Sequence, residues 1–130
     1  MGAPPITAGL FDVDDQGELT LLGGASASSG FVHFPRRQVC PFTGADDVVP
    51  VELPRTGRLL WWTDVQVAPP GYDGPVPYGL GVVALDVEPE LRVIGRLQGD
   101  SATFESGRPM TVVAEELETP DGPRTTWAFA

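Results

Sequence analysis

Glycine and proline occur along the whole chain and make up 16 and 14 of its 130 residues. Glycine weakens helices through its backbone entropy, and proline lacks the amide hydrogen that a helix or an inner strand needs. Long helices are therefore excluded, and short strands joined by tight turns are favoured. Hydrophobic residues make up 42% of the chain and charged residues 20%, which suits one modest core. We predict a mainly β protein.

Five runs in the second half have the composition of strands. In residues 91–97 every second residue is apolar, and Arg92 and Arg96 lie between them. A loop at 68–77 and a polar connection at 98–109 separate some of these runs. Five such strands close most economically into an OB-type barrel, because closure removes exposed strand edges. The five runs are residues 57–67, 78–87, 91–97, 110–117 and 124–129.

The first half forms a smaller unit in front of this barrel. We expect an N-terminal arm over residues 1–17, a small β module over 18–53 and the OB-fold barrel over 54–130. Within the module, residues 23–30 predict a loop, because they are small and flexible. The strand patterns are residues 18–22, 31–34 and 48–53, and the side chains expected to pack the module are Leu21, Leu22, Phe31, Phe34 and Phe42.

Two turn segments of the module have the spacing of a zinc ribbon without its ligands. They are Ser26-x-x-Ser29-Gly30 and Cys40-x-x-Thr43-Gly44. With cysteine at all four positions they would form a tetrahedral thiolate site. Serine and threonine hydroxyls do not ionise near neutral pH, and one thiolate cannot hold a structural Zn²⁺. We therefore predict a degenerate ribbon without zinc and a chain without a cofactor of its own.

The charge of the chain limits its partners. Its net charge is −10, and its eight basic residues are all arginine. Such a chain repels phosphate backbones, which argues against a general nucleic-acid binder but leaves room for a local arginine cluster on a small phosphorylated ligand. The single cysteine, Cys40, excludes an intramolecular disulfide, and no apolar run reaches membrane-spanning length. We expect a cytoplasmic protein.

A catalytic set is not evident. The one histidine, His33, lies in sequence near Ser26, Ser29 and Cys40, but no nucleophile elbow and no second base accompany it. We expect His33 to pack on a strand. The acidic groups at 12–15, 46–47 and 115–118 are typical of turns and strand ends that keep a protein in solution. We therefore expect no catalytic residues in this chain.

One loop and one tryptophan are the best candidates for contact with a partner. Pro69, Pro70 and Gly71 stiffen the loop in front of Tyr72, which is an amphipathic side chain suited to an interface. Trp61 and Trp62 are adjacent on a predicted strand and should face opposite sides. We expect one of them in the core and the other half-exposed, with Trp62 as the candidate for the partner contact.

Three segments in this order carry a resemblance to a known family. They are FPRRQVCP at 34–41, VAPPGY at 67–72 and SGRPMTVVAEE at 106–116. With the ribbon in front and the barrel behind, the chain resembles the rubredoxin-like zinc-ribbon plus OB-fold family of acyl-CoA-associated proteins (domain of unknown function thirty-five). The resemblance covers residues 7–118. The chain differs from the family in two respects: the ribbon cysteines other than Cys40 are missing, and the final segment, RTTWAFA, is unlike the family's.

The resemblance implies an accessory subunit rather than an enzyme. Such proteins pair with thiolase-fold enzymes (thiolases or lipid-transfer-protein-like retro-aldolases, some in steroid side-chain degradation) or with hotdog-fold hydratases, and help to form the acyl-CoA channel. It implies a hetero-oligomer whose complex binds a CoA thioester. The candidates for contact with the CoA phosphates are Arg36, Arg37, Arg92 and Arg96. The alternative is a stand-alone OB-fold module for a small ligand or a single strand.

Overall fold

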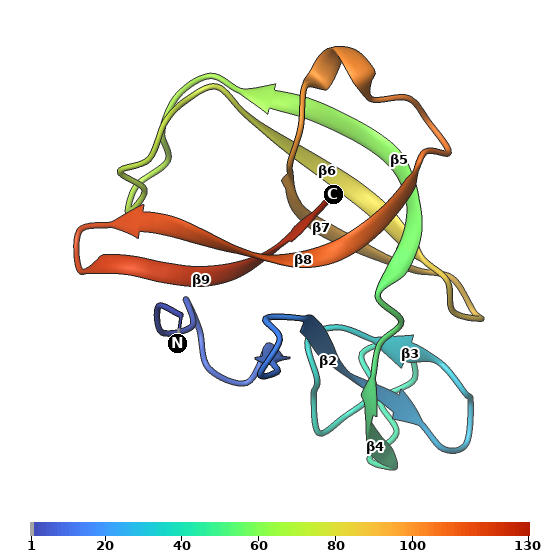
Figure 1. Ribbon diagram of the computed structural model, residues 1–130. Helices are drawn as coiled ribbons and strands as arrows, with labels where there is room; N and C mark the ends of the chain where they lie inside the picture. The colour runs from blue at the N-terminus through green and yellow to red at the C-terminus, as the bar shows by residue number, and fades with distance from the viewer. Residues whose placement is uncertain (1) are drawn as a thin grey trace.

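The computed structural model describes residues 2–130, which form a small N-terminal sheet and a closed barrel (Figure 1). In the N-terminal sheet, β2 is the central strand and pairs antiparallel with the other three. Figure 1 shows this sheet below the barrel, with the start of the chain running beneath β9. The strands of the N-terminal sheet are β1 (Phe11–Val13), β2 (Leu19–Ser26), β3 (Val32–His33) and β4 (Val48–Glu52).

The barrel has the predicted OB-fold arrangement. Its strands follow the closed order β5-β6-β7-β9-β8, in which only the β7–β9 pair is parallel. One short helix, η1 (Ser101–Thr103), lies in the connection between β7 and β8. Each of the five predicted strand runs overlaps one barrel strand. These strands are β5 (Thr56–Val65), β6 (Tyr78–Leu85), β7 (Leu91–Leu97), β8 (Pro109–Thr119) and β9 (Gly122–Phe129).

The prediction of a loop from residue 23 was wrong for its first part. β2 continues through Gly23 and Gly24 to Ser26, because these glycines let neighbouring segments approach closely. A Cβ at Gly24 would lie 2.6 Å from the His33 imidazole and 2.7 Å from Val48. β1 also forms inside the segment predicted to be an irregular arm. Glycine here serves close packing rather than a turn.

A bulge in β5 overturns the expectation that one tryptophan fills the core. Leu59 lies opposite Val83, but Trp61 lies opposite Val82, so Leu60 is an extra residue in β5. The extra residue changes which side chains point outward. Leu59 is fully buried, whereas Trp61 and Trp62 are 56% and 38% exposed. The side chain that fills the barrel at this point is therefore a leucine.

One continuous core joins the N-terminal sheet to the barrel. Leu19 and Leu21 belong to the same buried cluster as Leu59 and Phe129. Phe34 packs against this cluster as expected, but Phe31 and Phe42 are exposed and contact each other, with ring centroids 5.7 Å apart. The small sheet is therefore stabilised mainly through its contact with the barrel.

Trp127 of β9 forms the centre of this contact. Its ring meets the edges of Phe11 and Phe34, with centroids 6.4 and 5.4 Å away. Its indole nitrogen donates a 3.0 Å hydrogen bond to the carbonyl of Ile94. A single side chain thus contacts β1, the segment after β3, and β7. Edge-to-face aromatic pairs of this kind add stability beyond the area that they bury.

The start of the chain adds to the exposed edge of β9. Pro5 forms a parallel bridge with Thr125, and the Ile6 amide donates to the Thr125 carbonyl at 2.8 Å. The Thr125 amide in turn donates to the Pro4 carbonyl, and the Thr125 hydroxyl donates to the Ala3 carbonyl, both at 2.8 Å. These bonds cover a part of β9 that β7 does not reach. Over residues 2–130 the fold contains no helix of the length and apolar character needed to cross a membrane.

The Gly95→Ala substitution should destabilise the protein by about 1–3 kcal/mol, because overpacking forces neighbouring side chains to move. A Cβ at Gly95 would lie 2.8 Å from the Phe129 ring and 3.0 Å from the Trp127 indole nitrogen. Urea unfolding followed by tryptophan fluorescence measures the change. Ser106→Ala, in an exposed turn, is the control. Equal unfolding midpoints for the two variants would contradict this view of Gly95.

Candidate functional site

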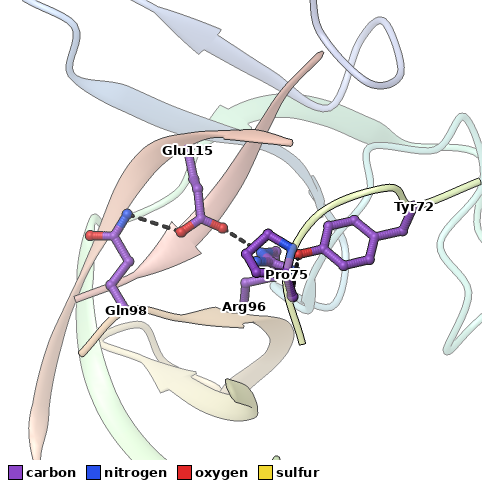
Figure 2. Close-up of polar contacts among 5 residues, drawn as sticks. All are labelled: Tyr72, Pro75, Arg96, Gln98 and Glu115. Carbon is purple, nitrogen blue, oxygen red and sulfur yellow. Dashed lines mark hydrogen bonds and ion pairs between the residues drawn. The ribbon is translucent and has the colours of Figure 1, made fainter. Parts of the chain in front are cut away.

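Arg96 of β7 lies at the centre of a polar cluster on the barrel (Figure 2). Its guanidinium pairs with the carboxylate of Glu115 on β8. It also lies over the rings of Tyr72 and Tyr78, with its central carbon 5.1 and 4.1 Å from their centroids. Gln98 donates to the second oxygen of Glu115 at 3.2 Å. We call these five residues the Arg96 cluster.

The ion pair at the centre of the cluster is shielded from water. Only 17% of the Arg96 side chain and 20% of the Glu115 side chain are exposed. Burial alone would lower the pKa of Arg96, but the hydrogen bond and the charge of Glu115 outweigh it and hold the pKa above its ordinary value. Because its charge is already neutralised by a partly buried carboxylate, Arg96 is not free to bind a phosphate group.

The loop between β5 and β6 is fixed to the barrel through this cluster. Tyr72 packs edge-on against Tyr78, with the ring centroids 5.1 Å apart. The Tyr72 hydroxyl donates to the Pro75 carbonyl at 2.7 Å (Figure 2). The Asp73 amide donates to the carbonyl of Glu118 on β8 at 2.9 Å. Tyr72 therefore holds the loop in place, while Pro69, Pro70 and Gly71 are exposed before it.

A cleft of about 870 Å³ opens beside the cluster, between the start of the chain, the turn after β1, and strands β8 and β9. Glu115 and Gln98 lie in its wall. Asp12, Asp14 and Glu116 add further negative charge. Carboxylates at this density disfavour the phosphate groups of CoA and favour cations. The cleft alone does not suit the ligand that the resemblance implies.

The other arginine candidates differ in what holds them. Arg36 donates to the carbonyls of Gly23 and Val51 at 2.7 and 3.2 Å, so it ties the segment after β3 to strands β2 and β4. Arg92 pairs with Glu90 at 2.8 Å in an exposed position. The guanidinium of Arg37 makes no hydrogen bond or ion pair within the described residues. Of the four candidates, Arg37 is the one whose guanidinium has no partner within residues 2–130.

The ribbon turns keep a shared geometry without a metal donor set. In each turn, the amide of the final glycine donates to a carbonyl four residues earlier, Gly30 to Ser26 at 2.8 Å and Gly44 to Cys40 at 2.9 Å. Both glycines have positive φ, 76° and 75°. One thiol with the hydroxyls of Ser26, Ser29 and Thr43 does not fit Zn²⁺.

Asp47 accepts hydrogen bonds from the first of the two ribbon turns. Its carboxylate accepts a 2.8 Å bond from the Ser26 hydroxyl and a 2.7 Å bond from the Ser28 amide. The bonds from Ser28 and Ser26 lower the pKa of Asp47. In the second turn, a hydrogen bond with the Thr43 hydroxyl lowers the pKa of the buried Cys40 thiol. Each ribbon turn thus has its own hydrogen bonds near the positions where a ribbon would hold its metal.

His33 has no catalytic geometry. It is 2% exposed, its Nε2 accepts from the Arg37 amide at 3.2 Å, and its Nδ1 has no partner among residues 2–130. Burial lowers its pKa. A buried, neutral imidazole without a hydrogen-bonded nucleophile cannot act as the base of a hydrolytic site. Its packing on β3 agrees with the expectation from the sequence.

Sequence reasoning did not find Glu115, Tyr78, Gln98 or Trp127. Glu115 stands in an acidic run at 115–118 that has the appearance of solvent-exposed charge. Its pairing with Arg96 depends on β9, which lies between β7 and β8 at this point of the barrel. Strand register across a closed barrel is not encoded in local pattern, so no sequence signal marks this pair.

Comparison with known proteins places this architecture in a family. The model of the ChsH2 C-terminal OB-fold domain matches residues 50–115, just over half of the chain. The match covers the end of β4 and most of the barrel, and it leaves most of the N-terminal sheet outside.

A curated relative and a solved structure agree with this match. The chain is 32% identical over 69 residues to a DUF35 domain-containing scaffold protein of Pyrococcus furiosus. That match covers 53% of this chain and 50% of the relative, so the chain spans about half the length of the curated relative that it matches.

The solved structure is described as the Ltp2-ChsH2(DUF35) aldolase. Its chain superposes with a TM-score of 0.62 and 26% identity, and the match covers 85% of this chain and 83% of that one. The coverage extends beyond the barrel into the N-terminal half. From the family model, the relative and the shared architecture, this chain belongs to the DUF35 family and contains its ChsH2-type OB-fold domain.

Proposed function

We propose that this chain is a non-catalytic accessory subunit that pairs with a thiolase-fold, aldolase-type enzyme acting on acyl-CoA. The observation that carries the proposal is the similarity to the Ltp2-ChsH2(DUF35) aldolase over 85% of the chain. The name of that structure joins a DUF35 protein to a second protein, and the curated relative is described as a scaffold protein. A scaffold needs no nucleophile, which is consistent with the buried imidazole of His33, whose Nδ1 has no hydrogen-bond partner within residues 2–130.

The proposal assigns the contact with the enzyme to Trp62 and to the loop tip at Pro69, Pro70, Gly71 and Tyr72. The Arg96 cluster holds this loop on the barrel, so the tip is presented in one position before the partner binds. Pre-ordered aromatic anchors lower the entropy cost of association. A steroid-type acyl group and a share in the acyl-CoA channel are part of the same proposal.

The test of assembly is co-expression with the Ltp2-like aldolase subunit of the same organism, followed by size-exclusion chromatography. The wild-type chain should co-elute with that subunit in a stoichiometric complex. Trp62→Ala with Tyr72→Ala should weaken the complex at least about tenfold, because truncating aromatic anchors removes contact energy. Phe42→Ala, at an exposed position of the N-terminal half, is the control. A chain that elutes alone in the presence of the subunit would refute the proposal.

The test of ligand contact is Arg37→Ala in the assembled complex. Its guanidinium has no partner within residues 2–130, so it can meet a CoA phosphate without breaking an existing ion pair or hydrogen bond. The substitution should raise KM for the acyl-CoA about tenfold with little change in kcat, because a charge-assisted hydrogen bond is lost in ground state and transition state alike. Arg124→Ala, whose side chain donates to the adjacent Pro123 carbonyl, is the control. An unchanged KM would exclude Arg37 from the ligand site.

We also propose that the N-terminal half folds without zinc. Purified protein should contain no stoichiometric zinc by elemental analysis, and a chelator should leave its Tm unchanged. Asp47→Ala should lower the Tm, because the Ser26 hydroxyl and the Ser28 amide lose their acceptor. One zinc per chain, or a Tm that falls with chelator, would show the donor assignment to be wrong.

A further inference from the structure

The bulge at Leu60 gives the outer face of β5, β6 and β7 a row of apolar side chains. Trp61 lies opposite Val82, and Val82 lies opposite Ile94. Residues directly opposite each other on paired strands point to the same side of the sheet. Trp61 is 56% and Ile94 is 60% exposed, although both lie inside paired strands. A bulge that turns an indole outward is typical of a functional surface.

Arginines stand on both sides of this row. In the neighbouring row, Arg58 of β5 and Arg92 of β7 lie opposite Ala84 of β6, one on each side of it. On the other side of the apolar row, Arg96 follows Ile94 two residues later on β7. The Arg92 guanidinium lies 5.2 Å from the centre of the Trp61 ring. We call Arg58, Trp61, Val82, Arg92 and Ile94 the indole face.

The charge of this face differs from that of the chain. Arg58 donates to the Gly107 carbonyl and has no ion pair within residues 2–130. Arg92 pairs with Glu90, but both side chains are more than half exposed, and such pairs contribute little and exchange partners readily. The face therefore presents an apolar centre beside available arginines on a chain of net charge −10.

These features fit a protein surface that has an apolar centre bordered by carboxylates. Tryptophan and arginine are the side chains most enriched at the centres of protein interfaces. A second copy of this chain fits poorly, because a two-fold contact would pair one indole face with another, and that face offers arginines rather than a carboxylate border to meet Arg58 and Arg92. A nucleic acid fits poorly as well, since Arg96 is neutralised by Glu115 and the whole chain repels phosphate.

We propose that the indole face docks the aldolase-type subunit, on a surface of that subunit with an apolar centre and a carboxylate border. This proposal rests on the proposed function and extends its contact surface. The indole face is continuous with the loop of that contact, because Arg96 follows Ile94 on the same side of β7 and lies over the ring of Tyr72.

The experiment measures binding of the aldolase subunit to Trp61→Glu and Ile94→Glu by interferometry. A carboxylate in the apolar row meets the carboxylates of the partner, so each variant should raise Kd at least about 30-fold, the range of an interface hot spot. The matched control is Val49→Glu on β4, a 47% exposed valine of the N-terminal sheet, which should bind as the wild type does. Circular dichroism and urea unfolding check each fold. If a glutamate variant does not fold, Trp61→Ser and Ile94→Ser replace it.

The outcomes separate the two proposals. If the wild type binds the subunit and folded Trp61 and Ile94 variants bind equally well, the indole face is not the docking surface, and the proposed function stands. If the wild type does not bind the subunit, the proposed function fails and this inference fails with it. Tight binding of a fluorescent oligo-dT, or self-association in sedimentation, that the same variants abolish would overturn the assignment of the occupant.

Discussion

Trp127 contacts Phe11, Phe34 and the Ile94 carbonyl, and the packing of the N-terminal sheet against the barrel depends on these contacts. The N-terminal sheet is small, and its buried apolar side chains belong to the same core as those of the barrel, so packing against the barrel stabilises it. Trp127 places the large apolar surface of β9 against it, and Leu19 and Leu21 then complete the same core as Phe129. Trp127 thus helps to fix the N-terminal sheet, and with it the ribbon turns, against the barrel.

Arginine has several uses in this acidic chain. Arg96 holds a loop, Arg36 ties strands through backbone carbonyls, and Arg58 and Arg92 border an exposed indole. The residue type alone therefore says little about phosphate binding. The role of each arginine follows from the partner of its guanidinium. A partly buried carboxylate such as Glu115 neutralises its arginine and keeps it from binding an anionic ligand.

The architecture was predictable from the sequence where a feature is local. The alternation of residues 91–97 places Leu91, Val93 and Leu97 inside, as predicted. Features that depend on pairing were not predictable. The extra residue at Leu60 is defined only by the register with β6. Gly23 and Gly24 have the composition of a loop, and only the close contact with His33 in the folded protein explains why they lie in a strand. The pairing of Arg96 with Glu115 likewise requires the order of strands in the closed barrel.

The bridge between Pro5 and Thr125 has a consequence for how the chain matures. Residues near the start are synthesised long before β9, the strand that they need. Until β9 emerges, the hydrophobic side of β1 and β2 lacks the contacts that β9 provides, and the barrel lacks both Trp127 and Phe129. Contacts of such large sequence separation form slowly, since loop closure must precede them. The two halves, distinct as they are in Figure 1, are thus completed by the same late strand.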